Sequence, residues 1–306
     1  MAATIRIVPQ DEIARGTSDP PKVRIPATAL FADRAARFGT LAERSTGAGE
    51  YLGLFARVSA AQDQALREHG APDLPDEVHM QRSRAHGLPP LGCDRPLDPR
   101  WRVALARIVA SCAEGAPPGV AKALDQLRAA TGERLDESAK SLLDLDYPAL
   151  DAAEAPFIAA ALQVHWTAMV RALGTEAIGP IDVPNVCPAC GTPAVASVLA
   201  IDVPAPGTRY LHCALCACEW QLARGQCSFC EEREKVAFFH IEGGSEAIKA
   251  EACEACHSYL KVFNREKDAQ ADPVADDLAT LSLDVLMDDA GYQRAGPNLF
   301  FVPGPA

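Results

Sequence analysis

The chain has 306 residues, of which 48% are hydrophobic and 23% are charged, and its formal net charge is −12. This length allows two or three domains, and the composition is ordinary for a soluble protein. The negative charge argues against binding to nucleic acid, because affinity for phosphate backbones depends on clusters of lysine and arginine.

The beginning of the chain carries no recognisable export signal. The first 16 residues, MAATIRIVPQDEIARG, lack a basic segment followed by an apolar run. No apolar run elsewhere approaches the roughly 20 residues that span a bilayer. We therefore expect a cytoplasmic protein without an integral membrane segment, and in that compartment the 11 cysteines favour metal ligation over disulfides.

The part of the chain before about residue 180 has the pattern of helices. It is rich in Ala, Leu and Arg, and its cysteines are Cys93 and Cys112. Asp98 and Pro99 form a helix-start signal before WRVALARIVASC, and the segment GAPPG at 115–119 breaks that helix. Two amphipathic faces are predicted from apolar residues at helical spacing: Tyr51, Leu54, Phe55, Val58, Gln62 and Leu66, and Phe157, Ala161, Val164, His165, Met169 and Leu173. We expect an all-helical domain of six or more helices.

A change of pattern marks the end of this domain. The segment GTEAIGPIDVPNV, residues 174–186, contains Gly and Pro and lacks a helical period. Beyond it, short β-type runs at 195–201 and 235–241 precede turn signals at Gly207 and at Gly243-Gly244. We expect two hairpins, one for each run.

The end of the chain returns to a helical pattern. Asp276 to Asp289 predicts one further helix. The last residues, NLFFVPGPA, are apolar but irregular, so that they either pack against a domain or form a loose tail.

Eight cysteines in the C-terminal third form a tandem repeat of Cys-x-x-Cys pairs. In each quartet the two pairs are separated by 22 residues, and every cysteine of the first quartet recurs 40 positions later. The quartets are Cys187, Cys190, Cys213 and Cys216, and Cys227, Cys230, Cys253 and Cys256. Two such pairs supply the four sulfur ligands of a tetrahedral metal site. The repeat predicts two metal-nucleated modules, each with the order knuckle, strand, turn, strand, knuckle of a zinc ribbon or rubredoxin-like fold.

A closed site of four thiolates predicts a structural role. A module of about 30 residues does not bury enough apolar surface to fold alone, so the metal supplies folding free energy. Such a site has no open coordination position for a substrate, and the sequence lacks common catalytic motifs such as His-Glu-x-x-His. We therefore expect a protein that is not an enzyme. Tetrahedral thiolate geometry suits both zinc and iron, and the spacing does not separate them.

Two alternatives stay open at this point. The Cys187/Cys190 pair could in principle join Cys227/Cys230 in a cross-brace, although the matched spacing favours pairing within each 40-residue unit. Cys218 lies outside the repeat, because the residue 40 positions later is Ser258. It is either an ordinary buried thiol or a spare ligand or redox thiol.

The metal-binding region is itself acidic. Residues 187–256 contain five Lys and Arg against nine Asp and Glu, a local net charge of −4. Four thiolates around a divalent ion add about −2 at each site. We therefore expect no nucleic-acid partner, although some zinc ribbons do occur in transcription proteins.

Together these features predict an α+β architecture: an N-terminal all-helical domain followed by two tandem rubredoxin-like or zinc-ribbon modules. The predicted boundaries are 1–180 for the helical domain, 181–222 for the first metal module, 223–265 for the second, and 266–306 for a C-terminal helix and tail.

Several motifs resemble those of a known family, the bacterial formate dehydrogenase accessory proteins of the FdhE type. In the cysteine-rich region the matching pieces are Cys187-Pro-Ala-Cys190-Gly191, Cys213-Ala-Leu-Cys216-Ala-Cys218-Glu219-Trp220, Cys227-Ser-Phe-Cys230, and Cys253-Glu-Ala-Cys256-His257-Ser-Tyr259-Leu260-Lys261. In the helical half they are Tyr51-Leu52 through Gln62, Pro89-Pro90-Leu91, Asp98-Pro99 and Trp101-Arg102. The resemblance covers nearly the whole chain.

The resemblance implies a function that the residues alone do not specify. It implies a non-enzymatic cytoplasmic accessory protein, or chaperone, for maturation of respiratory formate dehydrogenase. Such a protein acts on the molybdenum- and selenium-containing catalytic subunit before export through the twin-arginine pathway. It also implies two rubredoxin-type iron ions, with zinc as the alternative. Other possible functions are a redox-active electron-transfer or sensor protein and, less favoured, a nucleic-acid-binding ribbon protein.

With this client in view, Glu219 and Trp220 are candidate partner-binding residues. They lie just beyond the first metal site, at a predicted groove between the helical domain and the ribbons. The alternative is a core aromatic residue with a hydrogen-bonded neighbour, since tryptophan serves equally as an interface anchor and as a large core residue. The oligomeric state is not specified by the sequence.

Overall fold

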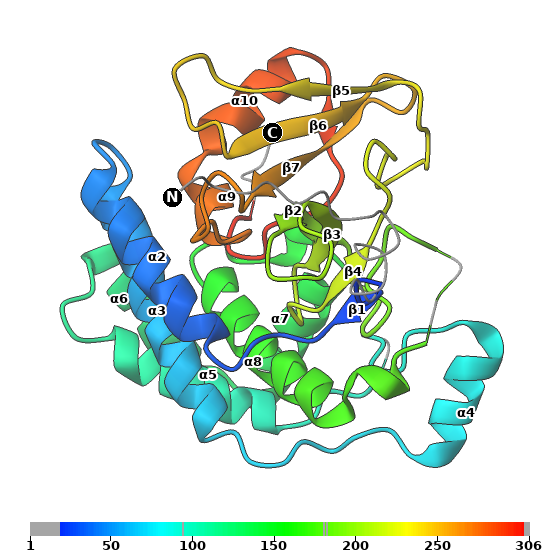
Figure 1. The fold of residues 1–306 in the computed structure, drawn as a ribbon. Coiled ribbons are helices and arrows are strands. Elements are labelled where there is room, and N and C mark those ends of the chain that lie inside the picture. Colours follow the sequence, from blue (N-terminus) through cyan, green and yellow to red (C-terminus); the bar gives the residue numbers. More distant parts are fainter. Residues whose placement is uncertain (1–18, 94, 180, 182, 303–306) are drawn as a thin grey trace, which may run out of the picture.

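Seven α-helices lie between residues 30 and 173 in the computed structural model, which describes residues 19–93, 95–179, 181 and 183–302 (Figure 1). They are α2 (Leu30–Arg44), α3 (Gly49–Arg67), α4 (Glu77–His86), α5 (Arg100–Cys112), α6 (Pro118–Ala129), α7 (Gly132–Leu143) and α8 (Ala155–Leu173), with short 3-10 helices η1 (Tyr147–Ala149) and η2 (Thr175–Ala177) on either side of α8. The predicted helical N-terminal region is confirmed. The start of α5 lies one residue later than predicted, because Pro99 is the N-cap, although Asp98 Oδ1 still accepts a hydrogen bond from the Arg100 N–H at 2.9 Å.

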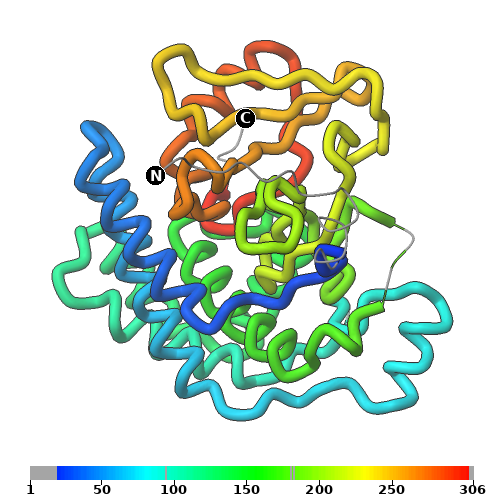
Figure 2. The backbone as a smooth tube through the Cα atoms, viewed as in Figure 1, coloured from blue at the N-terminus to red at the C-terminus, as the bar shows by residue number. Residues whose placement is uncertain are grey.

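Helix α8 differs from its prediction, because it is buried around its whole circumference. Every residue from Phe157 to Val170 is buried. The helix packs against α3, α5 and α7, and it runs through the centre of the molecule (Figure 2). The amphipathic face predicted for this segment is therefore wrong, since the opposite face is covered as well. A helix that is apolar all round belongs in a core, and the run IAAALQV has that character.

The second half of the chain forms one sheet. Its strands are β2 (Ala194–Ala200), β3 (Thr208–Cys213), β4 (Glu219–Gln221), β5 (Val236–Phe239), β6 (Ile248–Cys253), β7 (Ser258–Asn264) and β8 (Gln293–Arg294), together with β1 (Val23–Arg24) from the N-terminal region. The order is β1-β4-β3-β2-β7-β6-β5, with β8 beside β7. The two predicted hairpins are confirmed: β2 pairs with β3, and β5 pairs with β6, both antiparallel.

The two ribbons share a backbone ladder, which the sequence does not predict. Strand β2 of the first ribbon pairs in parallel with β7 of the second, with Ser197 opposite Val262. Strand β1 extends the other end of the sheet by pairing with β4, so that Val23 lies opposite Trp220. These pairings satisfy the N–H and C=O groups of β2 and β4, strands that would otherwise be exposed edges.

The C-terminal segment folds back onto the rest of the molecule. The single helix predicted for Asp276 to Asp289 is wrong, because the segment forms two helices, α9 (Ala275–Ala279) and α10 (Leu281–Asp289). The buried ammonium of Lys261 accounts for the break at Thr280. It donates to the carbonyl oxygens of Asp277 and Thr280, both at 3.0 Å, and so competes with the helical hydrogen bonds.

The last described residues pack against the helical region. Phe300 is buried and stacks on Phe55 of α3, with ring centroids 4.8 Å apart. At Gly296 the chain passes so close to β2 that a Cβ atom would lie 1.8 Å from the Ala194 carbonyl oxygen. Of the two alternatives for this segment, packing therefore holds for residues 298–300, and residues 303–306 lie outside the described residues.

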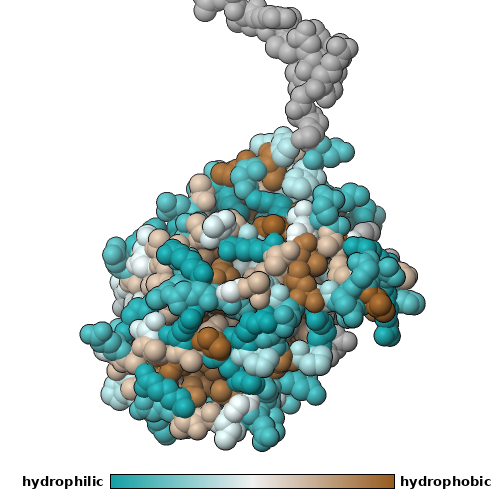
Figure 3. Space-filling view, turned by 90° about the horizontal axis from the view of Figure 1, so that it is seen from below, coloured by the Kyte–Doolittle hydropathy of each residue, from teal (hydrophilic) through white to brown (hydrophobic). Residues whose placement is uncertain are grey.

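The molecular surface is mixed. The face seen from below the helices carries scattered apolar patches among hydrophilic side chains (Figure 3). Among the described residues, no helix combines the length and the hydropathy that crossing a membrane requires.

Two candidate four-cysteine metal centres

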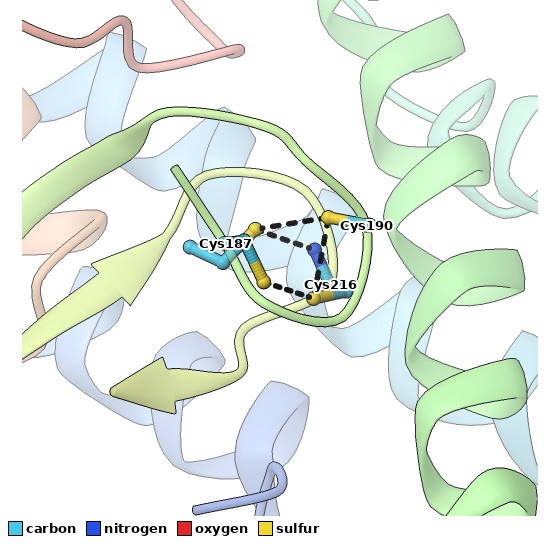
Figure 4. Close-up of side chains that lie close together, drawn as sticks. Cys187, Cys190 and Cys216 are labelled. Atoms are coloured by element: carbon cyan, nitrogen blue, oxygen red, sulfur yellow. Dashed lines mark hydrogen bonds between the residues drawn. The ribbon is translucent and has the colours of Figure 1, made fainter. Parts of the chain in front are cut away.

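The structure brings each cysteine quartet together at the ends of its ribbon strands. Cys187, Cys190, Cys213 and Cys216 form site 1, and Cys227, Cys230, Cys253 and Cys256 form site 2. In both groups the four sulfur atoms lie within 4.8 Å of one another. Figure 4 shows Cys187, Cys190 and Cys216 of site 1 with their side chains close together. The grouping follows the 40-residue repeat and not the cross-brace.

The sulfur separations fit a tetrahedral metal site. They are 3.4 to 3.6 Å in site 1 and 3.6 to 3.7 Å in site 2 for the close pairs. A disulfide needs about 2.05 Å, which excludes covalent pairing of these sulfurs. Four sulfurs at about 2.3 Å from one ion would be about 3.8 Å apart. The donor set and its spacing therefore suit a tetrathiolate-bound ion such as zinc or iron.

Backbone N–H groups donate to sulfur atoms in both sites. Cys213 Sγ accepts from the N–H groups of Leu215 and Cys216, both at 3.4 Å. In site 2, Cys227 Sγ accepts from those of Phe229 at 3.4 Å and Cys230 at 3.5 Å. Such donors stabilise negative charge on sulfur, as a metal-bound thiolate requires.

The residue after the second cysteine of every pair has a left-handed backbone. These positions are Gly191, Ala217, Glu231 and His257, with φ between 55° and 81°. Only the first is a glycine, so the other three each cost on the order of 1 to 2 kcal/mol of backbone strain. In the sequence, a residue type typical of a left-handed turn follows only the first pair, as Gly191 in Cys187-Pro-Ala-Cys190-Gly191. The other three turns are indicated only by the repeated Cys-x-x-Cys spacing.

Site 1 is built into the helical region. Leu91 N–H donates to the Ala189 carbonyl oxygen at 2.8 Å, inside the first knuckle. Gln163 of α8 donates to the Ala214 carbonyl oxygen at 2.9 Å in the second knuckle, and Gln62 of α3 donates to Gln163 Oε1 at 2.9 Å. The Pro89-Pro90-Leu91 motif of the helical half therefore lies against the metal site, which sequence reasoning missed.

The two sites differ in burial. All four cysteines of site 1 are at most 1% exposed. In site 2, Cys227 and Cys253 are buried, Cys256 is half-buried and Cys230 is exposed. Phe229, between the cysteines of one pair, is 55% exposed. Solvent and other molecules therefore reach site 2 and not site 1.

Three thiols of site 1 lie in surroundings that oppose their ionisation. Burial raises the pKa of Cys187, Cys213 and Cys216 above the usual thiol range. In site 2, burial also opposes ionisation of Cys256, but hydrogen bonds from Ser258 outweigh it and lower its pKa to about 7. A bound divalent ion would supply the missing positive charge at both sites.

Cys218 and Ser258 occupy equivalent places beside the two sites. Ser258 Oγ lies 3.0 Å from Cys256 Sγ and 3.9 Å from Cys227 Sγ. Cys218 interacts in the same way with Cys187 and Cys216, and it is fully buried. It is therefore a neighbour of the four thiols, as Ser258 is, and not a member of the quartet.

Glu219 and Trp220 lie on β4, next to β1. Trp220 is 5% exposed, and its indole N–H donates to the Pro184 carbonyl oxygen at 2.8 Å. This burial favours the core alternative for Trp220. Glu219 lines a cleft of 560 Å³ between α2, β1, the first ribbon and the segment 265–272 that follows β7. Burial opposes its ionisation, but the His212 hydrogen bond and the charges of Arg265 and Arg24 hold its pKa at about 2.

Fold and sites together define a class of protein: a helical domain joined to a sheet of two ribbons, each with a four-cysteine centre suited to a metal ion. The chain belongs to the FdhE family of formate dehydrogenase formation proteins. Three family models match it: "FdhE, N-terminal" over residues 20–182, "FdhE, central domain" over 186–224, and "FdhE, C-terminal domain" over 226–301. The resemblance seen in the sequence is confirmed.

Similar proteins span nearly the same length. A protein named "Protein FdhE homolog" from Pseudomonas aeruginosa is 36% identical over 304 residues, covering 97% of this chain and 98% of its own. One of the same name from Stutzerimonas stutzeri is 37% identical over 305 residues, with 99% of both chains covered. The crystal structure of the FdhE protein from Pseudomonas aeruginosa superposes with a TM-score of 0.83 at 37% identity, covering 93% of this chain and 100% of that one.

Proposed function

We propose that this protein is a cytoplasmic, non-enzymatic accessory factor for respiratory formate dehydrogenase. It acts as a chaperone on the catalytic subunit of that enzyme before export through the twin-arginine pathway. The observation that carries the proposal is membership of the FdhE family over nearly the whole described chain, together with two four-cysteine centres. A centre with four protein ligands holds a fold together and leaves no coordination position for a substrate.

The eight cysteines are the metal ligands in this proposal, and iron is the metal, with zinc as the alternative. The choice of iron rests on what the FdhE resemblance implies, because the knuckle Cys187-Pro-Ala-Cys190-Gly191 and its left-handed glycine suit either metal. When bound, iron would supply one-electron Fe(III)/Fe(II) chemistry, whereas zinc would supply stability alone.

The client contacts the groove between the helical domain and the ribbons in this proposal. The 560 Å³ cleft lined by Glu219 supports this location, because ligand sites favour the junctions between domains. Nucleic acid is not a partner, since the net charge of the chain is −12.

A redox role is the second candidate, and the exposure of Cys230 favours it. Electron exchange requires that a ligand of the metal approaches the partner closely, and site 2 meets that condition. In this case the protein senses or passes electrons during assembly of the client. Protein isolated with zinc alone, and without iron–thiolate charge-transfer absorption, would rule this role out.

The test is affinity purification from cells that make formate dehydrogenase, under low oxygen, with metal analysis and identification of the co-purifying proteins. We expect two metal ions per chain and the formate dehydrogenase catalytic subunit as the main companion. A matched purification of a Glu219→Gln, Trp220→Ala double variant that is folded and metal-loaded tests the surface. Unchanged recovery of the client would refute a role of these two residues in binding it.

A further inference from the structure

A hollow of 380 Å³ lies in the helical domain between α7, the end of η1 and the start of α8. Its charged lining consists of one guanidinium group, Arg134, and three carboxylates, Glu137, Asp151 and Glu154, which gives a net charge of −2. It shares none of its described lining residues with the cleft of the proposed function. We propose that this hollow binds an organic cation, an ammonium or guanidinium group carried on an aliphatic chain.

Helix α7 supplies the polar wall of the hollow. Its polar lining residues recur at the spacing i, i+3, i+4 and i+7, which places them along one side of the helix: Arg134, Glu137, Ser138 and Ser141. The buried residues of α7 lie on another side and belong to the core: Leu135, Ala139 and Leu142. Because α7 packs against η1 and α8, its polar side borders the start of α8, and the charges of both helices meet at the hollow.

A buried carboxylate of the hollow lacks one hydrogen-bond partner. The Glu154 side chain is 2% exposed, and its Oε2 atom accepts from Arg134 Nη2 at 2.7 Å. Its Oε1 atom has no hydrogen-bond partner among the described residues. Buried carboxylates normally have both oxygens bonded, because burial removes the water that would otherwise solvate their charge. The missing partner of Oε1 is therefore a hydrogen-bond donor, and a cationic donor also balances the charge.

The other two carboxylates add negative charge that no described cation neutralises. Glu137 is exposed and forms no ion pair with a described residue. Asp151 Oδ1 accepts from the N–H groups of Ala153 at 2.8 Å and Glu154 at 3.3 Å, and Asp151 likewise has no ionic partner in the described part of the chain. The N-terminus of α8 contributes roughly half a positive charge, which does not offset the net charge of −2. The hollow therefore attracts cations.

Arg134 controls access to the buried carboxylate. Its side chain is 44% exposed, and it reaches Glu154 through a single contact of 2.7 Å. Rotation of this side chain into solvent opens Glu154 to the hollow. The carboxylate stays paired in this exchange, because the cation of the ligand replaces the guanidinium group. Ammonium and guanidinium groups each carry several N–H donors, enough for both oxygens of Glu154 and for a neighbouring carboxylate.

The spread of the carboxylates favours an organic cation over a metal ion. Among the described residues, the groups whose ligand atoms all lie within 4.8 Å of one another are the two cysteine quartets, so these three carboxylates do not converge on one point. Leu150 and Ile158 also line the hollow, and such apolar side chains suit the methylene groups of an aliphatic chain. The cation comes either from a lysine or arginine side chain of a polypeptide or from a free aliphatic amine.

The test uses the full-length, zinc-loaded protein labelled with nitrogen-15. It is titrated with putrescine and with a capped pentapeptide that has lysine at its centre. The controls are the same peptide with norleucine, which keeps the aliphatic chain without the charge, and magnesium ion, which has the charge without the chain. We expect saturable amide shifts confined to α7, residues 149–151 and the first turn of α8 with one or both organic cations. The tighter binder of the two distinguishes a polypeptide source from a free amine.

Three variants separate a charge effect from damage to the fold. Glu154→Gln should weaken binding about tenfold, the effect of losing one charge-assisted hydrogen bond. Glu137→Gln, at an exposed position, should keep the fold and weaken binding by up to about fivefold. Arg134→Gln should strengthen binding, because the competing cation is removed, whereas a merely damaged fold would weaken it. Asp125→Asn is the control on α6, where Asp125 pairs with Arg128, and it should change nothing.

Four outcomes would overturn the assignment: no saturable shifts with either organic cation, equal binding of the norleucine peptide, tighter binding of magnesium, or weaker binding to the Arg134→Gln variant. The experiment contains no formate dehydrogenase, so any of these results would leave the proposed client unaffected. Conversely, cation binding without recovery of the catalytic subunit in the purification would retain the site and refute the client.

Discussion

The two four-cysteine centres have the same sulfur geometry in different surroundings. Close sulfur separations are 3.4 to 3.6 Å in site 1 and 3.6 to 3.7 Å in site 2, and each knuckle has the same left-handed turn. Yet site 1 is fully buried against α8, whereas site 2 has an exposed cysteine. The repeated sequence therefore specifies the arrangement of four sulfur ligands at each site, here called the ligand cage. The rest of the fold determines how far solvent reaches each cage and which elements depend on it for stability.

The largest expected difference between the two sites is the loss of stability when two of their cysteine ligands are replaced. The Cys187→Ser, Cys190→Ser double variant should lose the metal of site 1 and unfold at least the first ribbon. Structural zinc contributes about 10 to 16 kcal/mol, which matches or exceeds the whole stability of a typical domain. Because Leu91 and Gln163 bond to the knuckles of site 1, the helical region should lose stability as well.

The matched variant is Cys227→Ser, Cys230→Ser. It should lose one metal ion and the order of β5 and β6, while the helical region keeps a cooperative thermal transition. Metal analysis and circular dichroism during heating measure both effects. Equal losses of helical stability in the two double variants would contradict the difference between the sites.

The second expected difference concerns the rate of metal release. A colorimetric chelator attacks through exposed ligands, and Cys230 offers such a path whereas site 1 does not. We expect two kinetic phases of one ion each, with the fast phase at least about tenfold faster. The Cys230→Ser variant should alter only the fast phase. Release in a single phase would mean that burial of the cysteines does not control access to the metal.

The sequence predicts the local parts of this structure well. Cys-x-x-Cys spacing, hairpin glycines and the Asp98-Pro99 signal each act within a few residues, so their outcomes do not depend on distant segments. Helices α3 and α5 and strands β2 and β5 follow from such signals. The quartets also come together as the 40-residue repeat indicates.

Long-range pairings account for what the sequence does not predict. The parallel ladder between Ser197 and Val262 depends on segments that are 65 positions apart, and no local pattern encodes it. The break between helices α9 and α10 at Thr280 depends on Lys261, which lies on strand β7. Gln163 looks like an ordinary polar residue in an apolar helix, although its isolation in the run IAAALQV was a signal that it has a buried partner.

A smaller effect is expected where α8 holds site 1. Gln163→Leu removes the donor to the Ala214 carbonyl oxygen and leaves that acceptor buried without a partner. This should lower the free energy of unfolding by about 1 to 3 kcal/mol. It should also speed metal release from site 1 while leaving site 2 unchanged. Gln64→Leu is the control, because Gln64 is exposed on α3 and bonds only to Glu68. Equal effects on both sites would show that α8 stabilises the fold without acting on site 1.

The smallest effect is expected from exchanging the neighbours of the two cages. Cys218→Ser should give site 1 a hydroxyl donor like that of Ser258, and Ser258→Cys should give site 2 a thiol. Both changes keep a donor of similar size, so each should alter metal release from its own site by less than about tenfold, the lower end of typical effects of such neighbours. Ser258→Ala removes the donor at 3.0 Å from Cys256 Sγ and should exceed the effect of Ser258→Cys. If Cys218→Ser instead abolishes metal binding at site 1, Cys218 is itself a ligand, and the equivalence of the two cages is lost.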